Sequence, residues 1–327
     1  MPKSILHTVK IAGLFLALAA AGTAPALAQS DYPTKPVRLI VPFPPGGSND
    51  VVGRMIAIQL SDRLGKQVVV DNRGGAGGTI GTEVVSKAAP DGYTLLVISI
   101  AHAVAPWLYD LHYDSIKSFA PVAILATGPN VLVVNPELPV HSVKELIDLA
   151  KQKPGQLNYA SAGIGSFQHL GGELFKLDAG VDMVHVPYKG GGPAMTDVLG
   201  GYTKIMFSSL VQTTGFIRNG QLRALGTGGA QRIAALSDVP TIAEAGVPGY
   251  EANNWWGIVA PANTPPAIIA KLHTEIAAVL NSELTKKQFA DQGAEPVQMT
   301  SAAFGEFIGK EIAKWEQVVK KGGIKAE

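Results

Sequence analysis

The chain contains no cysteine among its 327 residues. Disulfide-stabilised small domains and enzymes with a nucleophilic thiol are therefore excluded. An exported chain also needs a cysteine at its mature N-terminus to carry a lipid anchor, so a lipid-anchored form is excluded as well. Residues 29–327 are long enough for two ordinary domains, and we expect a hydrophobic core alone to hold the fold together.

A large net charge is also lacking. The 27 Lys and Arg residues nearly balance the 26 Asp and Glu residues, and no basic block or acidic tail is present. Nucleic acids and anionic membrane surfaces are therefore poor candidate partners. If this protein recognises an anion, local dipoles and individually placed side chains must do so.

Motifs for nucleotide, metal and covalent chemistry are lacking too. The chain has no G-x-x-x-x-G-K-[ST], and Gly74–Gly81 does not fit G-x-G-x-x-G. The histidines show neither H-E-x-x-H nor H-x-x-x-H spacing. His169 and Glu173 share a helix face, where a surface or capping contact is favoured over a metal site. Gly46–Asp50 fails the G-x-S-x-G pattern at its last position. We expect no catalytic residue, metal or cofactor, and no enzymatic activity.

The first 28 residues have the pattern of a secretory signal peptide. Lys3 and Lys10 form a charged region, Ile11–Ala21 an apolar segment, and Ala26–Ala28 a small-residue cleavage site. The apolar segment is shorter than the roughly 20 residues that span a membrane. We expect cleavage before Gln29 and a soluble protein in a bacterial periplasm.

Short apolar runs alternate with helical patterns, which predicts an α/β fold with parallel strands and helices on both faces of the sheet. The first helix should begin with Asn49 or Asp50 as N-cap. Gly128-Pro129-Asn130 interrupts an apolar strand, and we place the first crossing between two lobes there. After Pro261 the pattern is helical and should return to the first lobe. The expected lobes are 29–127 plus 257–327, and 128–256.

Three glycine-rich turns each follow an apolar run and precede a helical pattern: Pro42–Asp50, Ser161–Ser166 and Tyr188–Pro193. Such a turn leaves unpaired N–H groups at a helix start, backed by the positive end of the helix dipole. This arrangement binds anions. Glycine and proline also punctuate the turns of any α/β protein. Three such turns, with Ser, Asn or Tyr beside the glycines, favour a carboxylate or phosphate site between the lobes.

Aromatic residues near these turns can cover an organic ligand. Strand alternation places the rings of Trp255 and Trp256 on opposite faces, so one belongs to the core and the other can line a cleft. Phe43 lies inside the first turn, where it either contacts a ligand or holds the loop down.

Seven stretches, in this order and spacing, match one known family over nearly the whole mature chain: Ile40–Asp50, Asp71–Gly78, Pro90–Leu96, Ser118–Val122, Gly165–Leu170, Val186–Gly190 and Trp256–Ala262. The sequence resembles the Bug-type periplasmic receptors of tripartite tricarboxylate transporters. The resemblance implies a two-lobed, type II periplasmic-binding-protein fold with a hinge of crossing strands. It also implies main-chain N–H groups of the first two turns as carboxylate ligands.

The function implied is capture of a small organic acid and its delivery to membrane permease subunits, by a receptor expected to be monomeric. Two alternatives remain. One is a sensory protein that presents its ligand to a signalling partner. The other, which is less favoured, is an α/β hydrolase that uses the same cleft. Many relatives have Asp where Ser208 stands, which disfavours an amino-acid ligand here. The expected ligand-binding residues are Phe43, Gly46, Gly47, Ser48, Asn49, Ala101, His102, Ser161, Gly163, Gly165, Ser166, His169, Tyr188, Gly190, Ser208 and Trp256.

Overall fold

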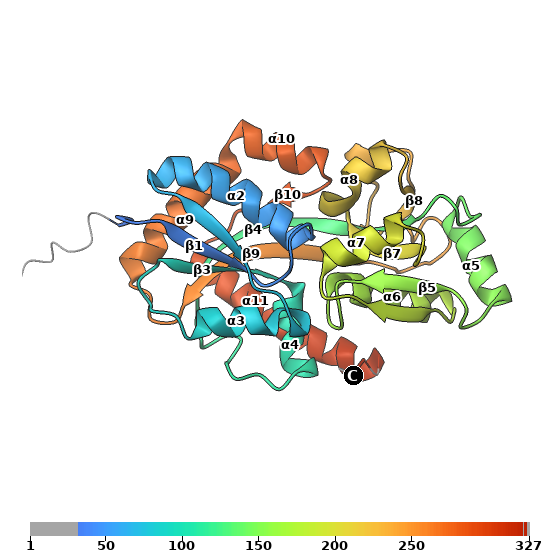
Figure 1. The fold of residues 1–327 in the computed structure, drawn as a ribbon, viewed down its shortest axis with the longest axis horizontal. Coiled ribbons are helices and arrows are strands. Elements are labelled where there is room, and N and C mark those ends of the chain that lie inside the picture. The colour runs from blue at the N-terminus through green and yellow to red at the C-terminus, as the bar shows by residue number, and fades with distance from the viewer. Residues whose placement is uncertain (1–31, 323, 326–327) are drawn as a thin grey trace, which may run out of the picture. The chain divides into compact units, whose positions relative to one another are not determined.

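One mixed sheet of ten strands runs through the protein (Figure 1). The computed structural model describes residues 32–322, 324 and 325, so the predicted signal peptide lies outside the described residues. Eight strands follow the order β2-β1-β3-β9-β4-β7-β5-β6, while β8 and β10 both pair with β4. The strands are β1 (Val37–Val41), β2 (Val68–Asn72), β3 (Thr94–Ser99), β4 (Phe119–Val134), β5 (Asn158–Ser161), β6 (Val184–Pro187), β7 (Ile205–Ser209), β8 (Arg223–Thr227), β9 (Asn253–Pro261) and β10 (Glu295–Pro296).

Helices connect these strands, and several begin where a strand has just ended. The α-helices are α2 (Ser48–Leu64), α3 (Thr79–Ser86), α4 (Ile100–Leu108), α5 (Val143–Gln152), α6 (Phe167–Ala179), α7 (Gly191–Leu199), α8 (Leu210–Arg218), α9 (Pro266–Asn281), α10 (Glu283–Asp291) and α11 (Ser301–Gly322). Two 3₁₀ turns span Ala76–Gly78 and Ala234–Leu236. The predicted parallel pairing is confirmed for β1 with β2 and β3, and for β5 with β6 and β7.

The start of α2 differs from the prediction. Gly47, with an extended backbone, is the N-cap, so the helix begins before Asn49. Asp50 is a residue of the first turn, and its carboxylate accepts the N–H of Gly46 at 3.0 Å. The N-cap makes no side-chain hydrogen bond, and Asp50 instead reaches back to an amide that precedes the helix, much as the third helical residue does in a capping box. The N-cap of α6 is Ser166, whose Oγ accepts the N–H of His169.

The long strand β4 links the two halves of the sheet. Its first part pairs with β9 as far as Pro129, and from Asn130 onward it pairs with β7 and β8. The predicted interruption at Gly128-Pro129-Asn130 is wrong, because an extended backbone accommodates the fixed φ of proline. The Asn130 N–H donates to the Ala252 carbonyl at 3.0 Å. Strands β4 and β9 therefore cross together from one half to the other, and the chain from Lys35 onward forms one compact unit.

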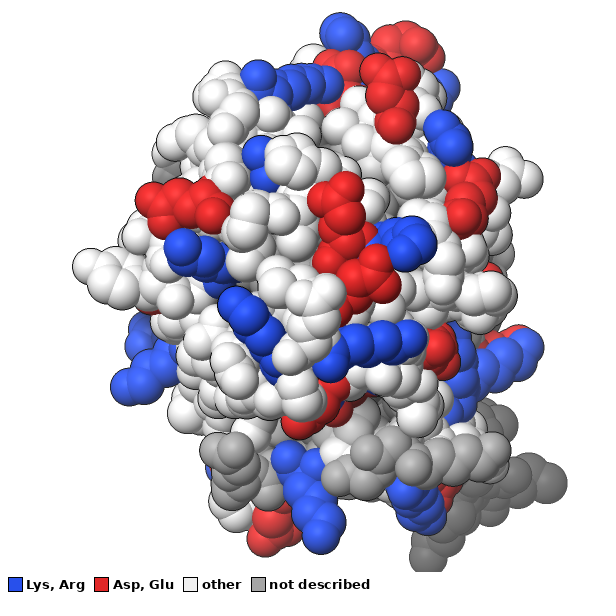
Figure 2. Space-filling model, turned by 90° about the vertical axis from the view of Figure 1, so that its right-hand side faces the viewer, with Lys and Arg blue, Asp and Glu red and all other residues white. Residues whose placement is uncertain are grey.

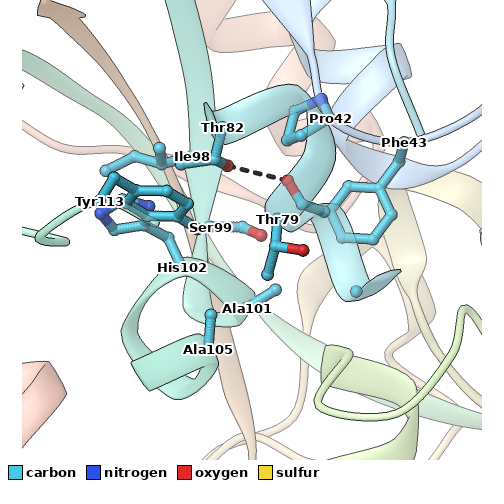
Figure 3. A pocket seen from close by; sticks show the side chains of 12 residues that line it. Pro42, Phe43, Thr79, Thr82, Ile98, Ser99, Ala101, His102, Ala105 and Tyr113 are labelled. Atoms are coloured by element: carbon cyan, nitrogen blue, oxygen red, sulfur yellow. Dashed lines mark hydrogen bonds between the residues drawn. The ribbon is translucent and has the colours of Figure 1, made fainter. Parts of the chain in front are cut away.

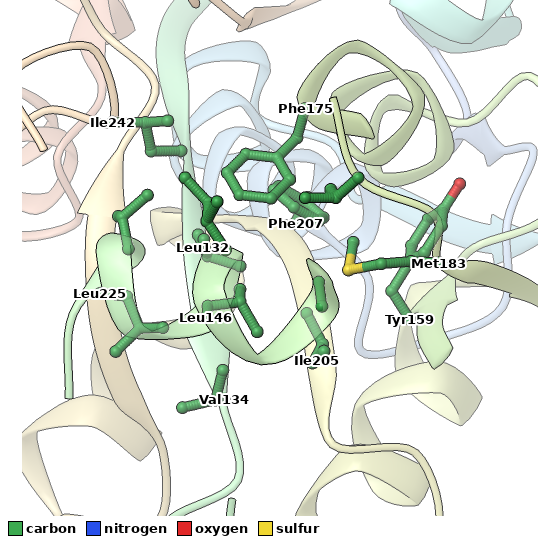
Figure 4. Packing of buried hydrophobic residues seen from close by; sticks show 14 of the residues in the cluster. Leu132, Val134, Leu146, Tyr159, Phe175, Met183, Ile205, Phe207, Leu225 and Ile242 are labelled. Carbon is green, nitrogen blue, oxygen red and sulfur yellow. The ribbon is translucent and has the colours of Figure 1, made fainter. Parts of the chain in front are cut away.

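Helix α5 covers the second half of the sheet. Ser142 and Glu145 have the spacing of a capping box, and Ser142 Oγ accepts the Glu145 N–H at 3.1 Å. Its apolar face packs Leu146 among side chains from β4, β7 and α6 (Figure 4). Phe175 and Phe207 lie in the same cluster with their ring centroids 5.1 Å apart. Burial of these side chains supplies the hydrophobic stabilisation of this half.

The C-terminal helices return to the first half of the sheet, as predicted. Helix α9 packs on α2 and β4, and α11 packs on α4 and β4. Trp255 belongs to this core, because its ring meets Phe304 and Phe307 edge-on and its Nε1 donates to Glu311. Among the described helices, none combines the length and apolar character needed to cross a bilayer.

Charged residues of both signs are interspersed on the face that Figure 2 shows, at the end of the molecule that carries α5. Several of them form ion pairs, such as Lys144 with Asp148 at 2.7 Å and Lys204 with Glu137 at 3.0 Å. This face therefore carries no extended region of one charge sign, in agreement with the balanced composition.

The core around α5 gives a first prediction. Leu146 is fully buried, so Leu146→Ala leaves a cavity and should lower the free energy of unfolding by about 2–5 kcal/mol. Lys151→Ala on the exposed face of the same helix should change it by less than about 0.5 kcal/mol. Urea unfolding of both variants tests this. Equal, small losses for the two would show that Leu146 does not contribute to the core.

Candidate functional site

The three glycine turns, far apart in the sequence, meet in the structure. A Cβ atom built on Gly47 would lie 3.6 Å from the Gly191 nitrogen, so the first and third turns are in backbone contact. A Cβ atom on Gly163 would lie 3.0 Å from the Tyr188 carbonyl oxygen, which places the second turn against the third. Side chains at these positions would hold the turns apart. The glycines therefore permit the close approach of three backbone segments.

A narrow pocket lies between these turns. Its cavity volume is about 20 Å³, room for roughly one water molecule. An organic acid of several carbon atoms needs more space than this, so the two sides must separate before such a molecule enters. The lining residues are Phe43, Gly47, Ser48, Asn49, Ser99, Ala101, Ala162, Ser166, Phe167, Gln168, Gly191 and Asn254.

Four helices begin at this pocket. Ser48 and Asn49 are the first residues of α2, Phe167 and Gln168 are the first of α6, and Gly191 is the first of α7. Helix α4 begins beside them, at Ile100. N–H groups in the first turn have no acceptor within their own helix, and the helix dipole adds partial positive charge there. The pocket is therefore surrounded by backbone donors suited to a negatively charged group.

The lining side chains are polar but neutral. Among the described residues that line the pocket there is no Lys, Arg, Asp or Glu. Asn49 Nδ2 donates to Ser99 Oγ at 3.3 Å across the pocket wall. The Oδ1 atom of Asn254 is buried without a hydrogen-bond partner in the described part of the chain. A buried polar atom without a partner is costly, and a molecule that donates a hydrogen bond here would remove that cost.

The nearest carboxylate serves the first turn instead of facing the pocket. Asp50 accepts the N–H of Gly46, and Arg54 forms an ion pair with it at 2.9 Å. Burial opposes ionisation of Asp50, but hydrogen bonds from Arg54, Gly46 and Asn72 outweigh this effect and lower its pKa. Asp50 is therefore ionised at neutral pH, and the amide of Gly46 is engaged within the protein.

Phe43 separates the pocket from two neighbours. It lines the central pocket, a second of about 10 Å³ beside His102, and a third of about 240 Å³ beside Gly163 and Tyr188. Figure 3 shows its ring facing the space beside Thr79 and Ser99. The ring of Phe43 is therefore part of the wall of all three pockets.

His102 lines the small pocket as a neutral imidazole. Its Nε2 lies 2.8 Å from the Ser115 carbonyl oxygen, and its ring meets Phe119 edge-on. Burial lowers the pKa of His102 to about 4 despite this hydrogen bond. His102 therefore brings no positive charge to the site at neutral pH.

Six of the predicted ligand-binding residues line the central pocket: Phe43, Gly47, Ser48, Asn49, Ala101 and Ser166. His102, Gly163 and Tyr188 line the neighbouring pockets. The remaining seven line none of these three pockets: Gly46, Ser161, Gly165, His169, Gly190, Ser208 and Trp256.

Three of these seven residues, Ser161, His169 and Ser208, are connected to the backbone of the turns by hydrogen bonds. Ser208 Oγ donates to Gln212, whose Nε2 in turn donates to the Gly191 carbonyl at 2.7 Å. His169 accepts the N–H of Gly165. Trp256 is fully buried, with an indole N–H that finds no acceptor among the described residues. Both tryptophans are thus buried.

Six further residues line the pocket without having been predicted: Ser99, Ala162, Phe167, Gln168, Gly191 and Asn254. Ser99 ends β3 directly before α4, and a polar residue between a strand and a helix is a signal that sequence analysis can use. Phe167 and Gln168 follow directly after Ser166, which was predicted as a ligand contact. Asn254 lies on β9, and only the crossing of this strand brings it to the pocket. No local sequence pattern indicates that crossing.

Comparison with known proteins agrees with this architecture. A family model described as "Tripartite tricarboxylate transporter family receptor" matches residues 52–324. The chain is 41% identical over 325 residues to protein BugT of Bordetella pertussis, covering 98% of this chain and 99% of that one.

Two similar solved structures hold carboxylates. An R. palustris protein with adipate has a TM-score of 0.88 and 38% identity, covering 90% of this chain and 100% of that one. MatC from Rhodopseudomonas palustris with bound malate has a TM-score of 0.83 and 33% identity, covering 88% and 100%.

The contact between the first and third turns gives a second prediction. A Cβ atom on Gly192 would lie 2.2 Å from the Pro45 carbonyl oxygen, so Gly192→Ala should force the two turns apart. We expect a larger radius of gyration by small-angle X-ray scattering. Gly215→Ala on α8, where no atom lies within 4 Å of the added Cβ, is the matched control. An unchanged radius for Gly192→Ala would show that the turns do not limit closure.

Proposed function

Because the chain belongs to the tripartite tricarboxylate transporter receptor family, we propose that it binds a small organic carboxylate between its glycine turns and delivers it to the membrane permease subunits of such a transporter. The observation that carries this proposal is the meeting of four helix starts at one pocket without charged side chains. Backbone N–H groups at helix starts stabilise carboxylate oxygens by hydrogen bonds and by the helix dipole.

We propose direct roles for the six predicted residues that line the central pocket, and supporting roles for the other ten. Ser48 and Asn49 would present N–H groups of α2 from one side, and Ser166 would position the N–H groups of α6 from the other. The relatives with adipate and malate support a ligand with carboxylate groups. The Ser208–Gln212 pair, in place of a carboxylate, disfavours a ligand that carries an ammonium group.

Closure of two lobes is the mechanism that we propose. The lobes are 29–127 plus 257–327, and 128–256, joined where β4 and β9 cross. A ligand bound to one lobe makes its second set of contacts only after closure, so it shifts the equilibrium toward the closed form. The narrow pocket fits a moving pair of lobes, since at about 20 Å³ it is too small for an organic acid and the turns must separate to admit one. We propose that the receptor acts as a monomer in the periplasm after cleavage of residues 1–28.

We further propose that the bound acid leaves unchanged. The described residues of the pocket bring together no nucleophile with a base to activate it, and the pKa of His102 is too low for a general base at neutral pH. Release to the permease, and not bond cleavage, is then the step that follows binding.

A panel of carboxylates tests this function directly. Residues 29–327 should show a higher melting temperature with at least one di- or tricarboxylate, such as adipate or malate, because a ligand that binds the folded state stabilises it. Calorimetry should give one site per chain, and mass spectrometry should recover the acid intact. A bound acid that is consumed would refute the receptor function.

The neutral pocket gives a third prediction. Asn49→Asp places a negative charge where a carboxylate should bind, at almost unchanged size. The repulsion between charges about 4 Å apart amounts to about 4 kcal/mol at an effective dielectric of 20, so affinity should fall by at least about a hundredfold. Calorimetry with the acid that binds best in the panel measures this.

The control for this variant is Asn219→Asp, which makes the same charge change at the exposed end of α8. It should leave the affinity within about twofold. Equal affinities for the Asn49 variant and the wild-type protein would place the carboxylate elsewhere.

A further inference from the structure

Two histidines stack behind the second glycine turn, outside the pocket. The rings of His169 on α6 and His185 on β6 lie with centroids 4.1 Å apart and planes 23° apart. His185 also stacks on Tyr159, with ring centroids 5.1 Å apart. Sequence analysis placed His169 among the ligand contacts and did not single out His185. Neither ring lines the central pocket, so their function is a separate question.

Both rings are connected to the backbone of the second turn. The N–H of Gly165 donates to His169 Nδ1 at 3.2 Å. On the other side, His185 Nε2 lies 2.6 Å from Ser161 Oγ, and Ser161 Oγ accepts the N–H of Gly163 at 3.0 Å. Two amides of the turn are therefore held by the imidazole pair, one directly and one through a hydroxyl group.

The turn needs such support because of its backbone conformation. Gly163 and Gly165 have φ angles of +114° and +74°, which are accessible to glycine but come without side chains that could hold the loop. The turn ends at Ser166, the N-cap of α6, and both Ala162 and Ser166 line the pocket. A change in this turn would therefore move the N-terminus of α6 relative to the pocket.

The hydrogen bond from Gly165 fixes the protonation state of His169. A backbone N–H can only donate, so Nδ1 must be the unprotonated nitrogen, and the proton of the neutral ring is on Nε2. A second proton on Nδ1 would remove the acceptor of Gly165 and place a cation against the neighbouring imidazole. The hydrogen bond to Gly165 therefore lasts only while His169 is neutral.

The charges around the pair are consistent with this state. Burial lowers the pKa of His169 to about 4, with Glu173 acting in the opposite direction and Lys176 in the same one. Burial, then His169, lower the pKa of His185 to about 3. Glu173 is itself occupied, because it accepts hydrogen bonds from the Tyr159 hydroxyl at 2.6 Å and from Lys176 at 2.9 Å.

We propose that His169 and His185 are the positioning residues of the second glycine turn: as a neutral stacked pair they hold the amides of Gly163 and Gly165, and so fix the N-terminus of α6 for the carboxylate. This inference rests on the proposed function for its consequence in binding, but its structural part holds without a ligand. His169 acts through Gly165, and His185 acts through Ser161.

The structural part is tested first, on ligand-free protein. Nitrogen-15 NMR at pH 7 should show His169 Nδ1 as an unprotonated ring nitrogen, and hydrogen exchange should show a protected Gly165 amide. His169→Phe keeps a ring for stacking but has no acceptor, so it should lose this protection. His169→Asn, whose Oδ1 can replace Nδ1 as acceptor, should retain it. A protonated Nδ1, or a protected Gly165 in the Phe variant, would overturn the proposal whatever the protein binds.

The binding part uses adipate as the probe at pH 7. His169→Phe should weaken binding by about tenfold or more, because a buried N–H of the turn is left without an acceptor, whereas His169→Asn should bind nearly as the wild type does. A purely structural role would instead lower the melting temperature of both variants and leave the affinity of the folded protein equal. Equal affinities of the two variants overturn the positioning role. If the wild type does not bind adipate, the acid that binds best in the panel replaces it as the probe. Absence of binding by every acid of the panel counts against the proposed function, and the ligand-free result still decides the role of the pair.

The pH dependence of binding gives a further test. Protonation of the ligand affects both proteins equally, so it cancels in the ratio of their dissociation constants. The pKa of His169 in the folded protein lies below its ordinary value, so the ring is neutral at pH 7 and gains its proton only as the pH falls toward 4. The dissociation constant of the wild type, divided by that of His169→Asn, should therefore rise to about twofold at pH 4, where half of the His169 rings are protonated. A ratio that is constant from pH 7 to pH 4 would contradict the proposal.

Discussion

The backbone N–H groups at the starts of α2, α4, α6 and α7 are the feature on which the rest of the structure depends. Each start lacks hydrogen-bond acceptors within its own helix, so four incomplete sets of donors meet at one place. A side-chain cation there would bind anions without regard to shape. Donors fixed in direction by four helices would instead favour an anion of suitable geometry, and the side chains that line the pocket carry no charge.

Two other features of the fold follow from the meeting of these four helix starts. The helix starts come from different parts of the sheet, so strands β4 and β9 must carry the chain between the halves. The turns that precede the helices must also approach one another closely, and only glycine permits this at Gly190 and Gly192, where a Cβ atom would lie 2.5 Å and 2.2 Å from atoms of Pro44 and Pro45. Glycine here serves contact between the turns.

Neutral histidines maintain one of these turns. Ionised side chains could also form hydrogen bonds to the turn, but a charge behind the second turn would change the electrostatic potential at the pocket. Burial keeps His169 and His185 uncharged at neutral pH, and the nearby charge of Glu173 is compensated by Lys176. The described groups behind this turn therefore combine firm hydrogen bonding with little net charge. His102 and Asp50 follow the same rule, one neutral through burial and the other paired with Arg54.

Local patterns determined much of this protein in advance. Apolar runs and helical periodicity predicted the alternating elements, Ser142 and Glu145 have the spacing of a capping box, and the glycine turns indicated an anion site, because these signals depend on neighbours in the chain. Tertiary structure alone decided which groups face the pocket. Gly163 and Gly165 looked like free donors until His169 and Ser161 were seen to occupy them, Asn254 reaches the pocket only through the crossing of β9, and Trp256 is buried inside the protein. Contacts between residues far apart in sequence leave no local periodicity, so only packing reveals them.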